Sequence, residues 1–331
     1  MATIKEIADK AGVSITTVSR ILNFDAALSV TDTTRARVLR IAEALDYTPR
    51  RKKAGRISKK IAVLQWHSAA QELNDLYYLQ IQNAIERSAL MMGYSLNYVT
   101  ITDFEKGVNK SFSGIIALGK YDHDEILNIA DKGLPIVFVG QNSLVYGFDS
   151  ITSDFVSPVQ WIIDHFQEVG INDIGLLIGQ EATSAGRHLI KDTRLKAFEI
   201  FGQEAGVYDP ARIFVGEFTP TSGYDLMNQA IEQLGDELPH AFIVGNDAMA
   251  VGVIRALREH NLAVPGRVSL ISFNDVAVAR YTTPKLSTVH AYTDLMGSGA
   301  LHLLRKRIAD PNRVAQQVNF ATKLILRESS K

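Results

Sequence analysis

The sequence contains no cysteine among its 331 residues. That absence excludes disulfide bonds, cysteine-ligated zinc, iron–sulfur clusters and thiol catalysis. Long hydrophobic runs are missing too, since no apolar stretch approaches the roughly 20 residues needed to span a bilayer. The first residues, Met1 to Glu6, lack the apolar segment of a secretory signal. We therefore expect a soluble, cytoplasmic protein, and its length predicts two or three domains.

Catalytic signatures are scarce as well. The sequence has no Gly-x-Gly-x-x-Gly fingerprint, no Gly-x-Ser-x-Gly elbow and no His-Glu-x-x-His pair. The stretch from Gly114 to Tyr121 resembles a phosphate-binding loop, but Tyr121 stands where Ser or Thr would meet magnesium. We expect no catalytic residue, no metal site and no cofactor, so the sequence favours a function other than that of an enzyme.

Charge is unevenly distributed along the chain. The first 60 residues hold 13 Lys/Arg and 6 Asp/Glu, whereas the remainder holds 22 basic and 30 acidic residues. A basic head on an acidic body indicates that the head binds a polyanion. The basic residues crowd most densely between Arg50 and Lys60. Alternatively, that stretch is a solvated linker.

The head has the pattern of a helix-turn-helix. Thr3 and Glu6 form a predicted capping box, Gly12 ends the first helix, and Ser14 is placed to cap a second helix over Ile15–Asn23. A third amphipathic helix is expected at about 33–45. On the second helix the apolar residues recur with the helical period and are expected to face the other helices. This leaves Ile15, Thr16, Arg20 and Asn23 on the outer face. A generic helical hairpin with a surface arginine is the alternative.

The body alternates strands and helices. Buried parallel strands are predicted at Ile61–Trp66, Gly114–Leu118, Ile136–Val139, Ile174–Ile178, Ala241–Val244 and Val268–Phe273. Helices are predicted between them, including Tyr77–Met92, Asp154–Val169, Thr221–Leu234 and Asp247–Glu259. This β-α-β series is long enough for two doubly wound lobes.

The head closely resembles the DNA-binding headpiece of the lactose/galactose repressor (LacI/GalR) family. The resemblance is carried by Thr3–Ala8, Ala11–Ser14 and Thr17–Asn23, followed by Tyr47 and Pro49 in a Tyr-x-Pro pattern. It implies that Ile15, Thr16 and Arg20 read bases in the major groove. The full set of DNA-binding residues that we predict is Ser14, Ile15, Thr16, Thr17, Ser19, Arg20, Asn23, Tyr47, Arg50, Arg51 and Ile57.

The predicted hinge after the headpiece departs from the family pattern. The nearest match to the family's Ala-Arg-x-Leu hinge helix is Ala54–Ile57, where Gly55 would weaken a helix by about 1 kcal/mol. Ile57 is our candidate for an apolar wedge in the minor groove. A basic, flexible strap that contacts only phosphates is the alternative.

The resemblance continues through the body and implies a cleft that binds an effector. Ala241–Gly252 resembles the family's strand followed by Asn-Asp-x-x-Ala-x-Gly, and Ser269–Asp275 resembles a strand that in the family ends in Asp-Asp. Asn274 replaces the first of those aspartates, which argues against a purine effector and leaves the sugar open. The implied effector-binding residues are Tyr77, Tyr78, Asp154, Arg194, Phe218, Asn246 and Asn274.

Each of these residues also has a purely structural interpretation. Asn246 and Asp154 could serve as helix caps, Arg194 as an exposed helix charge, and the aromatic residues as parts of the core. Aromatic faces nevertheless suit the apolar C–H face of a sugar. Within the family, the chain is most similar to repressors of galactose operons in Gram-positive bacteria and to the repressor of the evolved β-galactosidase.

The resemblance thus implies an all-α helix-turn-helix headpiece and an α/β core, similar to periplasmic binding proteins, of two doubly wound parallel-sheet lobes. We place the headpiece at 1–48, a basic hinge at 49–60, the N-terminal lobe at 61–159 and 291–321, and the C-terminal lobe at 160–290 and 322–331. No leucine heptads precede Lys331, so a homodimer on an inverted-repeat operator is expected.

The implied function is a transcriptional regulator, expected to be a repressor of a sugar-utilisation operon that responds to galactose or a galactoside. The double-stranded operator DNA, the sugar and a second copy of the chain are its expected partners, with no membrane. Two alternatives remain: a sugar-binding receptor without DNA regulation, and an α/β enzyme acting on a sugar.

Overall fold

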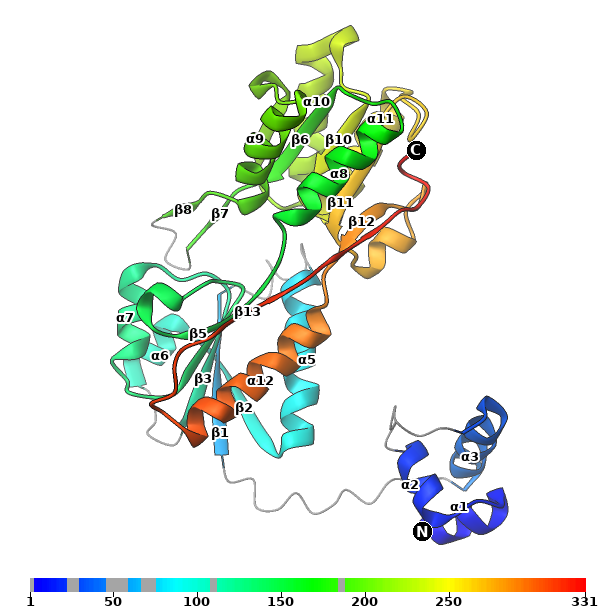
Figure 1. The fold of residues 1–331 in the computed structure, drawn as a ribbon, viewed down its shortest axis with the longest axis vertical. Coiled ribbons are helices and arrows are strands. Elements are labelled where there is room, and N and C mark those ends of the chain that lie inside the picture. Colours follow the sequence, from blue (N-terminus) through cyan, green and yellow to red (C-terminus); the bar gives the residue numbers. More distant parts are fainter. Residues whose placement is uncertain (1–2, 23–29, 46–58, 67–75, 108–111, 184–187) are drawn as a thin grey trace. The chain divides into compact units, whose positions relative to one another are not determined.

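The computed structural model describes residues 3–22, 30–45, 59–66, 76–107, 112–183 and 188–331 (Figure 1). The chain divides into two compact units, Met1–Arg56, which includes the predicted headpiece, and Ile57–Lys331, which we call the core. Residues 49–58 of the predicted hinge lie outside the described residues, so the hinge and the domain limits stay predictions. None of the helices in the described ranges is long and apolar enough to cross a membrane.

In its described residues the headpiece contains the helices α1 (Ile4–Ala11), α2 (Ile15–Leu22) and α3 (Asp32–Ala44). The predicted capping box is present, because the Thr3 backbone N donates to Glu6 Oε2 over 2.7 Å and the Glu6 backbone N donates to Thr3 Oγ1 over 3.2 Å. Gly12 ends α1 with a left-handed φ of 64°. The apolar faces of the three helices meet in one small core, whose buried members are Ile7, Ala8, Ala11, Val18, Ile21, Val38 and Ala42.

The first lobe of the core is built on a six-stranded parallel sheet with the strand order β13-β5-β4-β3-β1-β2. Its strands are β1 (Lys59–Gln65), β2 (Tyr94–Thr100), β3 (Phe112–Leu118), β4 (Ile136–Val139), β5 (Asp149–Ser153) and β13 (Gln317–Phe320). Its helices are α5 (Leu76–Met92), α6 (Ile101–Gly107), α7 (His123–Ala130) and α12 (Thr293–Ala309).

The second lobe has a six-stranded sheet in the order β14-β12-β11-β10-β6-β9, in which only β14 runs antiparallel to its neighbour. Its strands are β6 (Ile174–Gly179), β9 (Ile213–Gly216), β10 (Ala241–Val244), β11 (Ser269–Asn274), β12 (Ser287–His290) and β14 (Lys323–Ile325). Its helices are α8 (Ser157–Glu168), α9 (Thr193–Ala205), α10 (Pro220–Leu234) and α11 (Asp247–Glu259). A separate two-stranded hairpin pairs β7 (Glu181–Ala182) with β8 (Leu189–Ile190). Short 3-10 helices complete the core at Leu144–Tyr146, Pro210–Arg212, Gly235–Glu237 and Ala277–Arg280.

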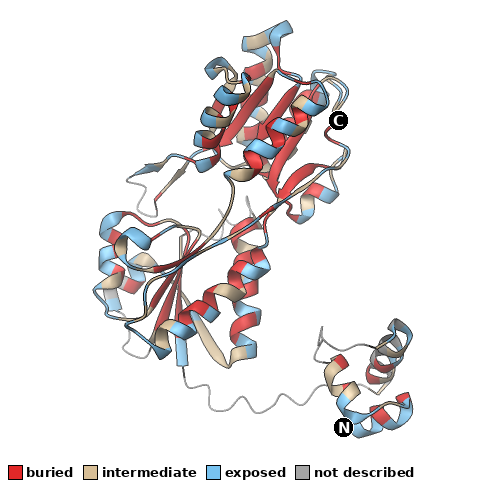
Figure 2. Ribbon diagram, viewed as in Figure 1, coloured by how far each residue is buried: buried red, intermediate tan, exposed pale blue. Residues whose placement is uncertain are grey.

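The central strands are unbroken apolar runs because both of their faces are buried. Helices cover both faces of each sheet, so every residue of β4, β6, β10 and β11 is buried (Figure 2). Apolar clusters accordingly lie on both sides of each sheet. The fold class predicted from the sequence is confirmed: a helical headpiece and an α/β core of two parallel-dominated sheets.

One predicted helix begins later than expected. The sequence predicts a helix from Asp154, whereas α8 begins at Ser157. The physical reason is a local turn, because Asp154 Oδ1 accepts hydrogen bonds from the backbone N atoms of Val156 (3.0 Å) and Ser157 (3.1 Å). The prediction also omitted the short or half-buried strands, which lack a long apolar run: β2, β5, β7, β8, β9, β12, β13 and β14.

The chain passes between the two sheets three times: from β5 to α8, from β12 to α12 and from β13 to β14 (Figure 1). Two of these crossings lie side by side, because the Asp154 backbone N donates to the Phe320 carbonyl over 2.8 Å and Thr322 Oγ1 donates to the Asp154 carbonyl over 2.9 Å. The carboxyl ends of the strands in both lobes therefore lie next to the crossings, the usual place for a ligand in open α/β sheets.

Candidate functional site

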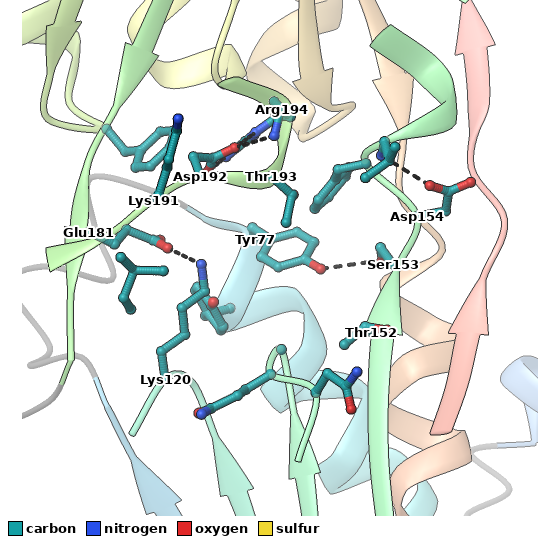
Figure 3. Close-up of a pocket in the computed structure, with 18 of the residues that line it drawn as sticks. Tyr77, Lys120, Thr152, Ser153, Asp154, Glu181, Lys191, Asp192, Thr193 and Arg194 are labelled. Carbon is teal, nitrogen blue, oxygen red and sulfur yellow. Dashed lines mark hydrogen bonds and ion pairs between the residues drawn. The ribbon is translucent and has the colours of Figure 1, made fainter. Parts of the chain in front are cut away.

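A pocket of about 460 Å³ lies at the carboxyl ends of strands from both lobes (Figure 3). That volume is within the range of small-molecule sites. The structure brings all the predicted effector residues to this pocket: Tyr77, Tyr78, Asp154, Arg194, Phe218, Asn246 and Asn274. The other lining residues are Lys120, Tyr121, Gly140, Gln141, Asn142, Thr152, Ser153, Phe155, Val156, Glu181, Thr183, Ile190, Lys191, Asp192, Thr193, Gln317 and Asn319. Binding of an effector by these side chains is a prediction.

Arg194 lies in the first turn of α9 and is buried rather than exposed. Its guanidinium forks onto Asp192, with Nε donating to Oδ1 over 2.8 Å and Nη2 to Oδ2 over 2.6 Å, while Nη1 donates to the Gly245 carbonyl. Three phenylalanine rings surround the guanidinium carbon at 4.9 to 5.3 Å, namely Phe155, Phe218 and Phe273. The alternative of an exposed helix charge is therefore wrong.

Asp192, which the sequence did not point to, supports this arginine. It caps α9 by accepting from the Arg194 backbone N over 2.8 Å. Burial alone would raise the pKa of the Asp192 carboxyl, but the charge and hydrogen bonds of Arg194, with a smaller contribution from Lys120, hold that pKa below its usual value. The carboxylate therefore stays ionised at neutral pH and keeps the guanidinium in one orientation.

Asn246 combines the two roles that the sequence left open. Its Oδ1 accepts from the Met249 backbone N over 2.8 Å and so caps α11, and the same residue lines the pocket. Because β10 ends at Val244 and α11 begins at Asp247, the asparagine occupies the short turn at the carboxyl edge of the sheet. Capping and pocket lining therefore coexist in one side chain.

Asn274 ends β11 in a left-handed backbone conformation, with a φ of 103°, and Asp275 follows with a φ of 54°. Non-glycine residues rarely adopt such angles, although Asn and Asp do so more often than most. Asp275 is anchored by Arg327 Nη2 on Oδ1 at 2.6 Å and by His290 Nδ1 at 3.0 Å from Oδ2. These contacts hold the turn in the conformation that places Asn274 at the pocket, and no local motif in the sequence indicated them.

Aromatic rings supply the apolar surface of the pocket. A Cβ atom at Gly179 would lie 2.4 Å from Cγ of Phe218, so the missing side chain makes room for that ring. Tyr77 stacks edge-on against Tyr78 at 5.1 Å between ring centroids, and its hydroxyl lies 3.3 Å from Ser153 Oγ (Figure 3). Both tyrosines belong to the first-lobe core cluster as well as to the pocket, so the core and pocket interpretations hold together.

Ionic side chains around the pocket balance in charge. The described lining residues include three cations, Lys120, Lys191 and Arg194, and three carboxylates, Asp154, Glu181 and Asp192. The described ranges contain no group of three or more His, Asp or Glu placed to hold a metal ion. Polar groups beside aromatic rings, without net charge, can bind an uncharged ligand rich in hydroxyl groups.

The second helix of the headpiece presents the predicted DNA-reading residues. Ile15 and Thr16 are exposed in the first turn of α2, and Ile15 keeps 51% of its surface accessible. Ser14 Oγ accepts from the Thr17 backbone N over 3.0 Å and caps the helix. Ser19 and Arg20 are half-buried on the same helix. The predicted residues Asn23, Tyr47, Arg50, Arg51 and Ile57 lie outside the described residues.

Comparison with known families covers both units. Residues 3–50 match the family described as bacterial regulatory proteins, lacI family, and residues 163–330 match a periplasmic binding protein-like domain. The HTH-type transcriptional regulator GalR of Lacticaseibacillus casei is 54% identical over 330 residues, with all of both chains covered. GalR of Streptococcus thermophilus is 39% identical over 335 residues, again with all of both chains covered. The regulator GanR of Bacillus subtilis is 33% identical, with 99% of each chain covered.

Solved structures share the fold. A complex of the transcriptional regulator CelR with cellobiose superposes with a TM-score of 0.73 at 23% identity and covers all of both chains. A lac repressor dimer bound to operator and the anti-inducer ONPF gives a TM-score of 0.70 at 24% identity over 99% of each chain. At this level of identity the likeness concerns the fold.

Proposed function

The chain belongs to the LacI family of bacterial regulatory proteins, and we propose that this DNA-binding transcriptional regulator represses a galactose-utilisation operon. In this proposal galactose or a galactoside is the effector and binds in the pocket between the lobes. The observation that carries the proposal is the pocket itself, which combines aromatic faces, amide and hydroxyl groups and balanced charges. The full-length likeness to two GalR regulators supports galactose as the sugar.

In this proposal a homodimer places two headpieces on an inverted-repeat operator. Exposed Ile15 and Thr16 suit contacts with thymine methyl groups, and Arg20 suits a two-point hydrogen bond to guanine. The basic charge of the first 60 residues supports attraction to the phosphate backbone. DNA binding implies that the protein works in the cytoplasm, and no reaction is assigned to it.

The effector acts by binding the two arrangements of the lobes with different affinity. A sugar that contacts Arg194 and Asn246 on one lobe and Tyr77 on the other stabilises the arrangement in which all three face it. The dimer transmits that preference to the spacing of its headpieces. The size of the response is limited by the difference between the two affinities.

Fluorescence anisotropy of purified protein tests the proposal. The labelled DNA is the fragment upstream of the protein's own gene, random DNA is the control, and galactose, lactose, unrelated sugars and purines are added at fixed salt. We expect preferential binding to the upstream fragment and a change in affinity with galactose or lactose alone. Equal binding to both DNAs, or a response to purines only, contradicts the proposal.

A further inference from the structure

One ion pair at the pocket joins the two lobes. Lys120 follows β3 of the first lobe after a single glycine, and Glu181 begins β7 of the hairpin in the second lobe. Lys120 Nζ donates to Glu181 Oε2 (Figure 3). Both side chains line the pocket and are largely buried, with 21% and 18% of their surfaces exposed. Neither residue belongs to a motif that the sequence assigned to effector binding.

The other charges of the lining already have partners. Arg194 is held by Asp192, and Lys191 pairs at 2.8 Å with Glu199, which lies in α9 and is not a lining residue. Asp154 accepts two backbone hydrogen bonds at the start of α8. With the pair formed by Lys120 and Glu181, every cation among the described lining residues has a carboxylate partner.

The ion pairs in the pocket lining favour uncharged sugars over anionic sugars. A sugar that carries a phosphate or a carboxylate loses hydration in a pocket and needs a cation in return. The Lys120 ammonium would be suited to that role, but Glu181 already neutralises it. The hydroxyls of an uncharged sugar both donate and accept, so they can bind beside an intact ion pair.

We propose that Glu181 is a specificity residue that restricts this pocket to uncharged sugars by neutralising Lys120. The inference rests on the proposed function, since it refines the class of sugar bound in the same pocket. Removing the Glu181 carboxylate while keeping Lys120 should therefore admit anionic sugars.

Isothermal titration calorimetry of the full-length protein tests this with galactose, galactose 6-phosphate and galacturonate as probes. The wild type is expected to bind galactose and to bind both anionic sugars at least ten-fold more weakly. Glu181→Gln should improve the affinity for the anionic sugars, relative to galactose, by at least ten-fold. Added salt should reduce that gain only modestly, because the Lys120 ammonium is largely buried and salt screens buried charges less than exposed ones.

Two further variants isolate the cause. In the double variant Lys120→Gln with Glu181→Gln, the gain for anionic sugars should disappear while galactose still binds. Glu328→Gln is the control. Glu328 forms an exposed ion pair with Lys285, and neither residue lines the pocket, so this variant should leave the affinities for all three sugars unchanged. Thermal unfolding of each variant verifies that it is folded.

The outcomes separate the two proposals. If the wild type binds galactose 6-phosphate as tightly as galactose, or if Glu181→Gln leaves the affinity ratio unchanged, the specificity role of Glu181 is wrong and the proposed function stands. If the folded wild type does not bind galactose in calorimetry and responds to neither galactose nor lactose in the anisotropy assay, the proposed effector class is wrong and the specificity role falls with it.

Discussion

The guanidinium of Arg194 donates two hydrogen bonds to the carboxylate of Asp192, from Nε to Oδ1 over 2.8 Å and from Nη2 to Oδ2 over 2.6 Å. Only one residue separates Asp192 from Arg194 in the chain. Asp192 caps α9 and Arg194 lies in the first turn of that helix, so the helix start aligns the pair. The guanidinium face in turn lies 4.9 Å from the Phe218 ring centroid. The arginine is thus a rigid, oriented part of the pocket wall.

Replacing Arg194 by lysine should weaken the sugar response while leaving DNA binding intact. Lysine keeps the charge but lacks the planar fork and the stacking surface, so neither Asp192 nor Phe218 is engaged as before. We expect sugar affinity measured by calorimetry to fall by at least about ten-fold. Operator affinity without sugar should not change, because the headpiece is a separate compact unit.

A matched control exists in the same lobe. Arg212 pairs with Asp209 at 3.2 Å outside the pocket, and Arg212→Lys should leave sugar affinity unaltered. Unchanged sugar affinity in Arg194→Lys would contradict a role for Arg194 in binding.

Asn246 offers a way to separate capping from sugar binding. Asn246→Ser retains an oxygen that can accept from the Met249 backbone N, whereas Asn246→Ala does not. We expect the alanine variant to lose about 1 kcal/mol of unfolding free energy and the serine variant to lose little. Both should bind sugar more weakly, because both remove the amide from the pocket. Urea unfolding and calorimetry measure the two effects; normal sugar affinity in both variants would leave Asn246 as a cap alone.

Asp247 should make stability depend on pH. Burial raises the pKa of this carboxyl to about 7, an effect opposed by hydrogen bonds from Ser272, Thr288 and the Val276 backbone and reinforced by the nearby Asp275 charge. Since the unfolded value is near 3.8, the folded chain holds a proton that the unfolded chain releases between these values. The stabilisation is therefore complete below the unfolded pKa and is lost as pH rises to about 7.

The expected slope reaches about 1.4 kcal/mol of unfolding free energy per pH unit inside that window. Urea unfolding from about pH 5 to pH 8 measures it. Asp247→Asn cannot titrate, so its slope should be shallower than that of the wild type. Parallel slopes in the two proteins would show that Asp247 is ionised throughout.

Arg20 should contribute to reading the operator. Arg20→Ala is expected to weaken operator binding by about 1–3 kcal/mol and to weaken binding to random DNA less, because a base contact is lost as well as a charge. Anisotropy with both DNAs at one salt concentration measures the difference. Lys132→Ala, which removes an exposed charge from the core, is the control. An equal loss of affinity for operator and for random DNA would indicate that Arg20 contacts phosphates and not bases.

Local sequence patterns predicted much of the fold because the forces that they report are local. The Thr3 and Glu6 box, the end of α1 at Gly12 and the cap at Ser14 depend on residues within one helical turn. The buried strands were recognisable because helices cover both sheet faces, which demands unbroken apolar runs. Strands such as β13 and β14 were not recognisable, since they are short and half-buried and have no such run.

Only part of the pocket lining was predicted, by likeness to a family, and the partners of those residues were not predicted. Asp192, Glu181 and Arg327 carry no motif, and their roles follow from contacts with Arg194, Lys120 and Asp275. Two of those contacts join residues far apart in the chain, because the residue numbers differ by 61 for Lys120 and Glu181 and by 52 for Asp275 and Arg327. Periodicity and spacing carry no information about such pairs.

By itself, the sequence determined the helix caps, the buried strands, the basic head and the absence of cysteine chemistry, because each depends on composition or on neighbours along the chain. Only the tertiary structure decided which charges of the pocket neutralise one another and how Asn274 is held at its edge. Those arrangements depend on three crossings that bring the carboxyl ends of two sheets together, and on long-range contacts whose energy exists only once the sheets have formed.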